Sequence, residues 1–149
     1  METHEKNGLT WTEMFVVVVL LGIFSAMAVP RISRASQQAR LNDLISDLQE
    51  VRSQMELYRI QHQDRFPGQA GACGQVDRDL FLKELTTRGD DGLGPYLQQV
   101  PRNGYNNLDT ITFVADPAAR PTGTEGTGWW FNSATGQFRA CDCDANTRY

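Results

Sequence analysis

Glu13 stands out chemically in this sequence because it is a carboxylate at the edge of a long apolar run. No charged residue follows it between Met14 and Val29. At the edge of a bilayer, an acidic side chain costs on the order of a few kcal/mol unless it finds a partner. Two explanations are open. Glu13 either reaches the membrane surface and ends a span, or pairs with a positive group when chains assemble.

Near the C-terminus, carboxylate and amide side chains have a spacing typical of metal ligands. Asp142, Asp144 and Asn146 match the first ligands of a calcium-binding loop. The glycine and the distal glutamate of such a loop do not follow them. We therefore expect a solvated tail and no cofactor, with calcium as the alternative.

The sequence contains no recognisable set of catalytic residues. His4 and His62 lie far apart, and no Ser/His/Asp or Cys/His set, phosphate loop or carboxylate pair accompanies them. Residues 88–90 read Arg-Gly-Asp, an adhesion tripeptide, but turn chemistry in a loop rich in Gly and Asp explains them well enough. The sequence therefore predicts no enzyme.

Length and charge limit the remaining classes. The 149 residues suffice for one domain. The net charge of -4 and the pI of about 5.1 argue against nucleic-acid binding, because phosphates are bound by clustered Lys and Arg. We expect no nucleic-acid partner.

The element that positions Glu13 is the apolar run itself. Residues 9–29 match the about 20 residues that cross a bilayer core, so a transmembrane helix is predicted. One alternative is a plain single-pass anchor. The other is a secretory signal, since Ala26-Met27-Ala28 fits signal peptidase. Acidic residues before the run oppose the positive n-region that such signals carry.

An amphipathic pattern follows the apolar run. Apolar residues recur there at i, i+3, i+4 and i+7, which predicts that the same helix continues to about residue 62. Gly22 and Pro30 are its weak points, because proline lacks an amide donor and crowds the preceding turn, so a kink is expected. The apolar stripe consists of Leu41, Leu44, Ile45, Leu48, Val51, Met55 and Tyr58.

The start of the chain resembles the prepilin signature of type IV pilins and type II secretion pseudopilins. The resemblance covers residues 8–35, and the amphipathic continuation supports it. It rests on a glycine, a glutamate five places later, an apolar run and a proline. The matching residues are Gly8, Thr10, Glu13 and Pro30.

This resemblance implies a processed filament subunit. Residues 1–8 would be a leader peptide that prepilin peptidase removes between Gly8 and Leu9, and the new amine of Leu9 would be methylated. In the filament, Glu13 would pair with the Leu9 amine of a neighbouring subunit. An unpaired carboxylate among packed apolar helices is penalised, so this pairing would fix the register of assembly.

The rest of the chain is expected to form a small head on this long helix. Residues 9–30 would be the transmembrane and filament-core half of the helix, and residues 31–62 its amphipathic half. Residues 63–107 indicate a connecting loop region with one short helix, and residues 108–149 an antiparallel β hairpin region and tail. The helix candidate spans residues 79–85, and the strand candidates span 110–116, 128–134 and 136–142.

The head is also similar to that of major pseudopilins. The implied fold is α+β, with the long N-terminal helix packed against a small antiparallel sheet, the type IV pilin fold. Trp129 and Phe131 share one strand face, since side chains alternate along a strand. We expect them to cover the apolar stripe of the helix as core aromatics rather than as ligand contacts.

Three cysteines lie in the head. An exported head lies in an oxidising space where disulfides persist, so a bridge from Cys73 to either Cys141 or Cys143 is expected. In the chain-entropy model such a bridge contributes roughly 3 to 4 kcal/mol. The alternative is metal binding by all three cysteines. The lack of a nearby histidine argues against it.

These patterns predict a structural subunit of a type IV pilus or a type II secretion pseudopilus. Its expected partners are other copies in a helical filament, prepilin peptidase, an inner-membrane assembly platform and minor pilins. It would lie in the bacterial inner membrane with a cytoplasmic N-terminus, and after assembly in a periplasmic or cell-surface filament. The alternative is a membrane-tethered binding protein whose helix is only an anchor. Gly8 and Glu13 distinguish the two, because an anchor needs neither.

Overall fold

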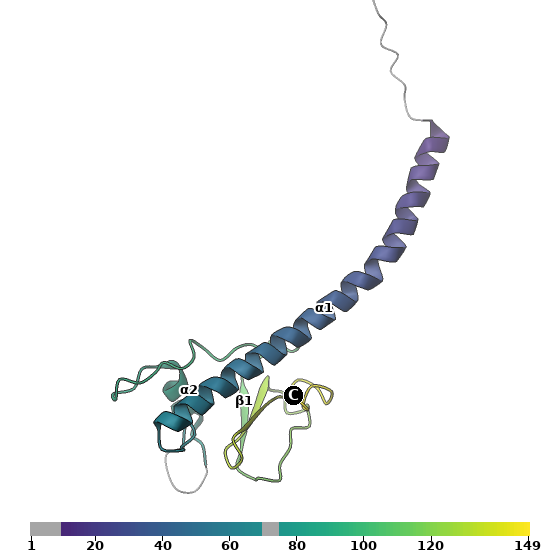
Figure 1. Cartoon of the computed structure of the whole chain (residues 1–149). Coiled ribbons are helices and arrows are strands. Elements are labelled where there is room, and N and C mark those ends of the chain that lie inside the picture. The colour runs from purple at the N-terminus through teal and green to yellow at the C-terminus, as the bar shows by residue number, and fades with distance from the viewer. Residues whose placement is uncertain (1–9, 70–74) are drawn as a thin grey trace, which may run out of the picture. The chain divides into compact units, whose positions relative to one another are not determined.

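The computed structural model describes residues 10–69 and 75–149, without the side chains of residues 26–34. The described chain is α+β, with two helices followed by a three-stranded sheet (Figure 1). It divides into two compact units, one up to Ala39 and one from Arg40 onward. The elements are α1 (Trp11–Gln61), α2 (Arg78–Thr86), β1 (Ile111–Val114), β2 (Trp129–Asn132) and β3 (Gln137–Ala140).

α1 confirms the predicted long N-terminal helix. Its 51 residues include both Gly22 and Pro30. The kink expected at these two residues stays a prediction. Within the described residues, no helix combines the length and the hydropathy required of a membrane span.

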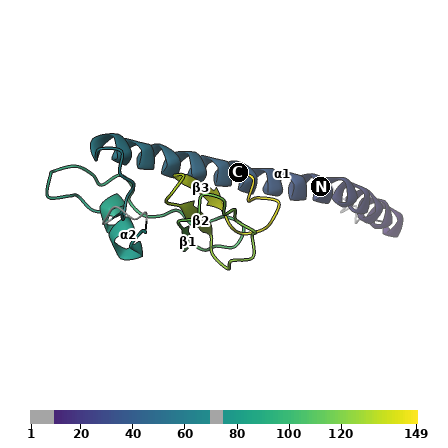
Figure 2. The same cartoon turned by 90° about the horizontal axis from the view of Figure 1, so that it is seen from below.

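The second compact unit is built on the C-terminal part of α1. Leu44, Leu48, Val51 and Met55 are at most 3% exposed, as the helical periodicity predicted. Figure 2 shows α2 and the three strands on the same side of this part of the helix. The apolar stripe of α1 therefore lies in one core with residues from α2 and from the sheet. The other buried members of that core are Phe81, Leu85, Leu97, Ile111, Trp129, Phe131, Phe138 and Ala140.

The sheet has the strand order β1-β2-β3 and is mixed. β2 and β3 form the predicted antiparallel hairpin, with Phe131 opposite Phe138. β1 instead pairs in parallel with β2, with Ile111 opposite Trp129, so the prediction of a purely antiparallel sheet was wrong. Residues 115–128 are long enough to return the chain to the starting end of β1, which is the crossover that a parallel pair requires.

α2 begins with a cap and places an aromatic side chain in the core. The Leu80 amide donates to Asp77 Oδ1 at 2.9 Å, which satisfies one of the amides left free at a helix start. Phe81 is fully buried, and its ring centroid lies 5.2 Å from that of Phe131. The helix predicted over residues 79–85 is thus confirmed, and its role is to close the core beside the sheet.

Candidate functional site

The described part of the chain begins with a reciprocal cap on α1. Glu13 Oε2 accepts hydrogen bonds from the amide and the hydroxyl of Thr10, both at 2.7 Å. The Glu13 amide donates in return to the Thr10 hydroxyl oxygen at 3.4 Å. This is a capping box, in which a residue at the helix start and one three places later satisfy each other's amides. Both contacts of the carboxylate use Oε2, which leaves Oε1 for another donor.

The predicted processing residues lie outside the described residues. These are Gly8 and Leu9, for which cleavage and N-methylation therefore stay predictions. Glu13 is the predicted assembly residue that the structure does describe, and its side chain is exposed.

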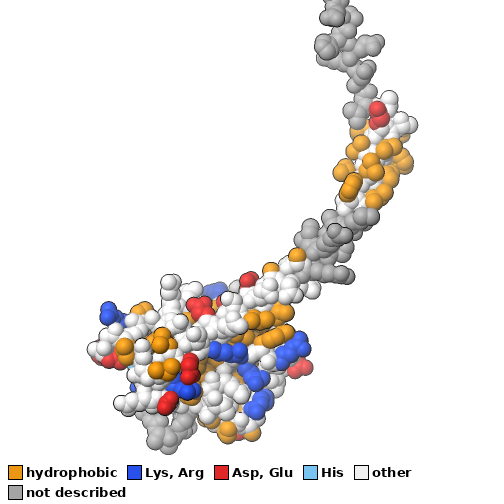
Figure 3. All heavy atoms as spheres, in the orientation of Figure 1, with side chains coloured by type: hydrophobic (Ala, Val, Ile, Leu, Met, Phe, Trp, Pro, Cys, Tyr) orange, Lys and Arg blue, Asp and Glu red, His pale blue; other side chains and the backbone are white. Residues whose placement is uncertain are grey.

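An apolar surface extends along α1 from Trp11 to Phe24, with Glu13 near its start. Its large hydrophobic side chains are 44% to 86% exposed, and Figure 3 shows hydrophobic side chains gathered along this stretch. Monomeric soluble proteins rarely expose a contiguous apolar surface of this kind, and such surfaces mark contact with protein or membrane. The side chains are Trp11, Met14, Phe15, Val16, Val17, Val18, Val19, Leu20, Leu21, Ile23 and Phe24.

The two C-terminal cysteines have different surroundings. Cys141 is 1% exposed, and its thiol donates to Glu125 Oε2 at 2.9 Å. Burial, together with the Glu125 carboxylate, raises the pKa of the Cys141 thiol to about 11. Cys143 is half-buried, and neither thiol forms a disulfide within the described residues. Cys73 lies outside the described residues, so the structure gives no support to the predicted bridge.

The weak calcium candidates form part of a hydrogen-bonded network. Asp142 Oδ1 accepts from Asn103 Nδ2 at 2.8 Å, and its Oδ2 accepts from Asn146 Nδ2 at 2.7 Å. Asn103 is fully buried and also donates to Gly128 O at 2.9 Å. Asp144 is exposed. The described residues contain no group of three or more His, Cys, Asp or Glu that could hold a metal ion. Calcium binding stays a prediction, and the network itself fastens the tail to the start of β2.

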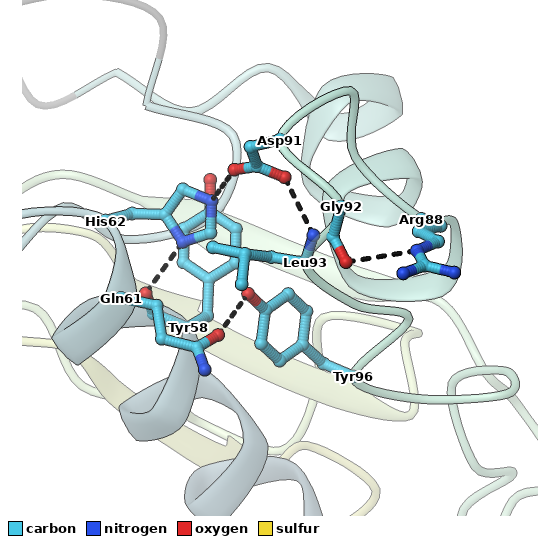
Figure 4. Close-up of polar contacts among 8 residues, drawn as sticks. All are labelled: Tyr58, Gln61, His62, Arg88, Asp91, Gly92, Leu93 and Tyr96. Atoms are coloured by element: carbon cyan, nitrogen blue, oxygen red, sulfur yellow. Dashed lines mark hydrogen bonds and ion pairs between the residues drawn. The ribbon is translucent and has the colours of Figure 1, made fainter.

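A cavity of about 400 Å³ lies beside the end of α1. Tyr58 of α1 and His62, directly after α1, line it on one side, and residues 88–91 line it from the loop after α2. The Arg-Gly-Asp residues therefore belong to a folded loop beside this cavity. Figure 4 shows that His62 and Asp91 point toward one another here.

One of these contacts could be predicted from the sequence, and the other could not. Thr10 and Glu13 have the S/T-x-x-E spacing of a capping box, so their contact was readable from the sequence. The contact between His62 and Asp91 was not, because it joins the end of one helix to a loop that follows another. No local pattern encodes such an approach.

No family model and no solved structure matches the chain. Curated relatives do. The chain is 24% identical over 108 residues to the type II secretion system core protein G of Aeromonas hydrophila, with 72% of this chain and 73% of that protein covered.

Other relatives carry the same name. The protein of Pseudomonas aeruginosa is 25% identical, with 72% of this chain and 73% of the relative covered. That of Klebsiella michiganensis is 27% identical, with 70% of this chain and 72% of the relative covered. These relatives confirm the resemblance to the type IV pilin and pseudopilin family. Their shared name is that of a core protein of a secretion system and not of an enzyme, which agrees with the prediction of no enzyme.

Proposed function

We propose that this chain is a structural subunit of a type II secretion pseudopilus, a filament in which the first half of α1 packs against the same half of other copies. The observation that carries the proposal is the exposed apolar surface from Trp11 to Phe24, with Glu13 near its start. The name of the relatives favours a secretion pseudopilus over a surface pilus. The long α1 and the small sheet support assignment to the type IV pilin fold.

Processing and membrane insertion are the steps that precede assembly in this proposal. Prepilin peptidase cleaves between Gly8 and Leu9, and the new amine of Leu9 is methylated. Residues 9–30 insert into the inner membrane with a cytoplasmic N-terminus and a periplasmic head. The membrane-embedded subunit then meets the assembly platform and minor pseudopilins. The apolar character of the first half of α1 supports this order, because a bilayer and a filament core both cover apolar surface.

Glu13 sets the axial register of the filament in this proposal. Its Oε2 is engaged by Thr10 of its own chain, so Oε1 can accept from the Leu9 ammonium of a neighbour. Taking a carboxylate into an apolar core without a counter-charge is unfavourable. The register that supplies the ammonium is therefore the favoured one.

The test is the substitution Glu13→Ala in cells that assemble the filament. Membrane insertion and leader cleavage should stay largely intact, since neither needs the pair. Filament recovery should fall at least about tenfold, which corresponds to loss of a charge-assisted contact of roughly 1.5 to 3 kcal/mol. The measurements are the amount of sheared or cross-linked filament and the intact mass of the membrane-bound subunit.

Asp90→Asn is the matched control, because it removes one exposed carboxylate from the head and should leave filaments at the wild-type level. Normal filaments with Glu13→Ala would mean that helix packing alone sets the register. Absence of filaments from the wild-type chain, with the head bound to another protein, would favour the membrane-tethered binding protein instead.

A further inference from the structure

His62, at the end of α1, faces a hydrogen-bond acceptor at each ring nitrogen (Figure 4). Its Nδ1 lies 2.9 Å from the main-chain oxygen of Tyr58. Its Nε2 lies 3.2 Å from Asp91 Oδ2. A carbonyl oxygen and an ionised carboxylate can only accept, and a neutral imidazole donates from one nitrogen alone. Both contacts are therefore hydrogen bonds only when His62 carries its second proton.

Asp91 links this contact to the fold of the loop at residues 88–93. Its other oxygen, Oδ1, accepts from the Leu93 amide at 3.0 Å. Leu93 O accepts from the Gly89 amide at 2.8 Å, and Gly92 O accepts from Arg88 Nε at 3.0 Å. The loop is thus held together internally, and Asp91 also joins it to His62, directly after α1.

The surroundings of His62 contain aromatic rings and a balanced set of charges. The ring stacks on Tyr58 with centroids 3.9 Å apart, and the edge-on ring of Tyr96 lies 6.2 Å away. Among the described residues, Asp91 is the carboxylate within ion-pair distance of the ring. The other charged groups that line the same cavity, from the turn after α1, from α2 and from the loop, are Arg65, Lys83, Glu84, Arg88 and Asp90.

A second contact between the loop region and α1 does not depend on charge. The Tyr96 hydroxyl donates to Gln61 Oε1 at 2.6 Å. Burial, and next the nearby Asp91, raise the pKa of Tyr96 above its ordinary value, so this hydroxyl stays protonated at neutral pH. The end of the loop therefore stays attached to α1 when the contact to His62 changes.

We propose that His62 and Asp91 form a pH-dependent clamp that holds the 88–93 loop against the end of α1 and closes one side of the cavity. In acid, the charged ring donates to Asp91 and the loop is held. Histidine is the side chain that changes charge between about pH 5 and 8. When the ring loses a proton, one of its two contacts lacks a hydrogen and the pair with Asp91 loses its positive charge, so the loop is held less tightly. The clamp is therefore strongest at the low end of this range and weakens as pH rises.

The test is amide hydrogen exchange of the full chain in detergent micelles, measured by mass spectrometry at about pH 5.5 and about pH 8. After correction for intrinsic exchange rates, peptides covering residues 88–93 should exchange about threefold faster at the higher pH, the size expected for a partly exposed ion pair. Peptides from α2 are the internal reference and should show no such change. Equal corrected rates for the loop at both pH values would overturn the clamp.

Two neighbouring aspartates provide matched variants. Asp91→Asn should abolish the pH difference and leave the loop at the faster rate at both pH values. Asp90→Asn removes the same charge from the same loop but has no described partner, and it should keep the wild-type difference. His62→Gln should also abolish the pH difference. With two variants, a folding defect in one of them does not decide the outcome. Retention of the pH difference in both His62→Gln and Asp91→Asn would refute the proposal.

Discussion

At the scale of single residues, Cys141 and Cys143 differ in the properties that govern thiol reactivity. The thiolate is the reactive form, so burial and a raised pKa both slow the attack of a cysteine on a reagent. Cys141 has both disadvantages, with 1% exposure and a pKa of about 11. Cys143 is half-buried. The two positions, equivalent by spacing in the sequence, are therefore unequal in the folded head.

We expect iodoacetamide at about pH 8 to modify Cys143 at least about tenfold faster than Cys141 in the folded chain. No lysine or arginine separates the two, so fragmentation of the shared tryptic peptide has to assign the adduct. In denaturant the two rates should become similar. For the same reason, non-reducing peptide mapping should assign any disulfide of Cys73 to Cys143. Preferential labelling of Cys141 in the folded chain would contradict this reasoning.

At the scale of elements, the start of β2 is fixed by a close approach of two main chains. Gly128 lies so near Leu108 that an added Cβ would stand 2.8 Å from the Leu108 carbonyl carbon. The Asn103 side chain donates to Gly128 O at 2.9 Å. This approach positions the strand that pairs with both β1 and β3.

Gly128→Ala should therefore destabilise the head by about 2 kcal/mol, in the range typical of overpacking. Gly104→Ala is the matched control, because an added Cβ there meets nothing within 4 Å. The measurement is the urea midpoint of the tryptophan fluorescence of the full chain in micelles. Equal midpoints for the two variants would show that the main chain at Gly128 relaxes easily.

The elements themselves were largely predictable from the sequence. The periodicity of the stripe from Leu41 to Tyr58 and the short apolar runs predicted both described helices and all three described strands. The parallel pairing of β1 and β2 was not predicted, because a strand pattern shows which faces are apolar but not the direction of its partner. In the candidate site, the capping contact of Glu13 could be predicted from a local sequence pattern. The contact between His62 and Asp91 depends on loop geometry and could not.

At the scale of the whole molecule, the chain contains two compact units that differ in how far their apolar side chains are exposed. In the unit up to Ala39, the described large apolar side chains from Trp11 to Phe24 are exposed, whereas the unit from Arg40 contains a buried core. This contrast is expected of a subunit that is completed by other copies, because only an assembly or a membrane can cover the first set. A binding protein with a plain anchor explains the apolar set and a glutamate at the edge of a span, but not Gly8 five residues before Glu13.

The mature chain is expected to begin at Leu9 with one added methyl group. The intact mass of protein recovered from a bacterium that makes prepilin peptidase checks both modifications at once. A strain without the peptidase should yield the uncleaved mass. A chain that begins at Val29 would identify a secretory signal, and retention of Met1 in the first strain would identify a plain anchor.

The core of the second unit also imposes an order on how the head can form. Arg52 Nε, on α1, donates to Phe138 O across 86 positions of sequence at 2.9 Å, and β1 obtains its parallel neighbour only when β2 has been made. Synthesis proceeds from the N-terminus, so α1 is complete long before the strands that cover it exist. Until then its stripe is open to chaperones and proteases. A chain interrupted before β3 would be a substrate for degradation rather than a slightly weakened subunit.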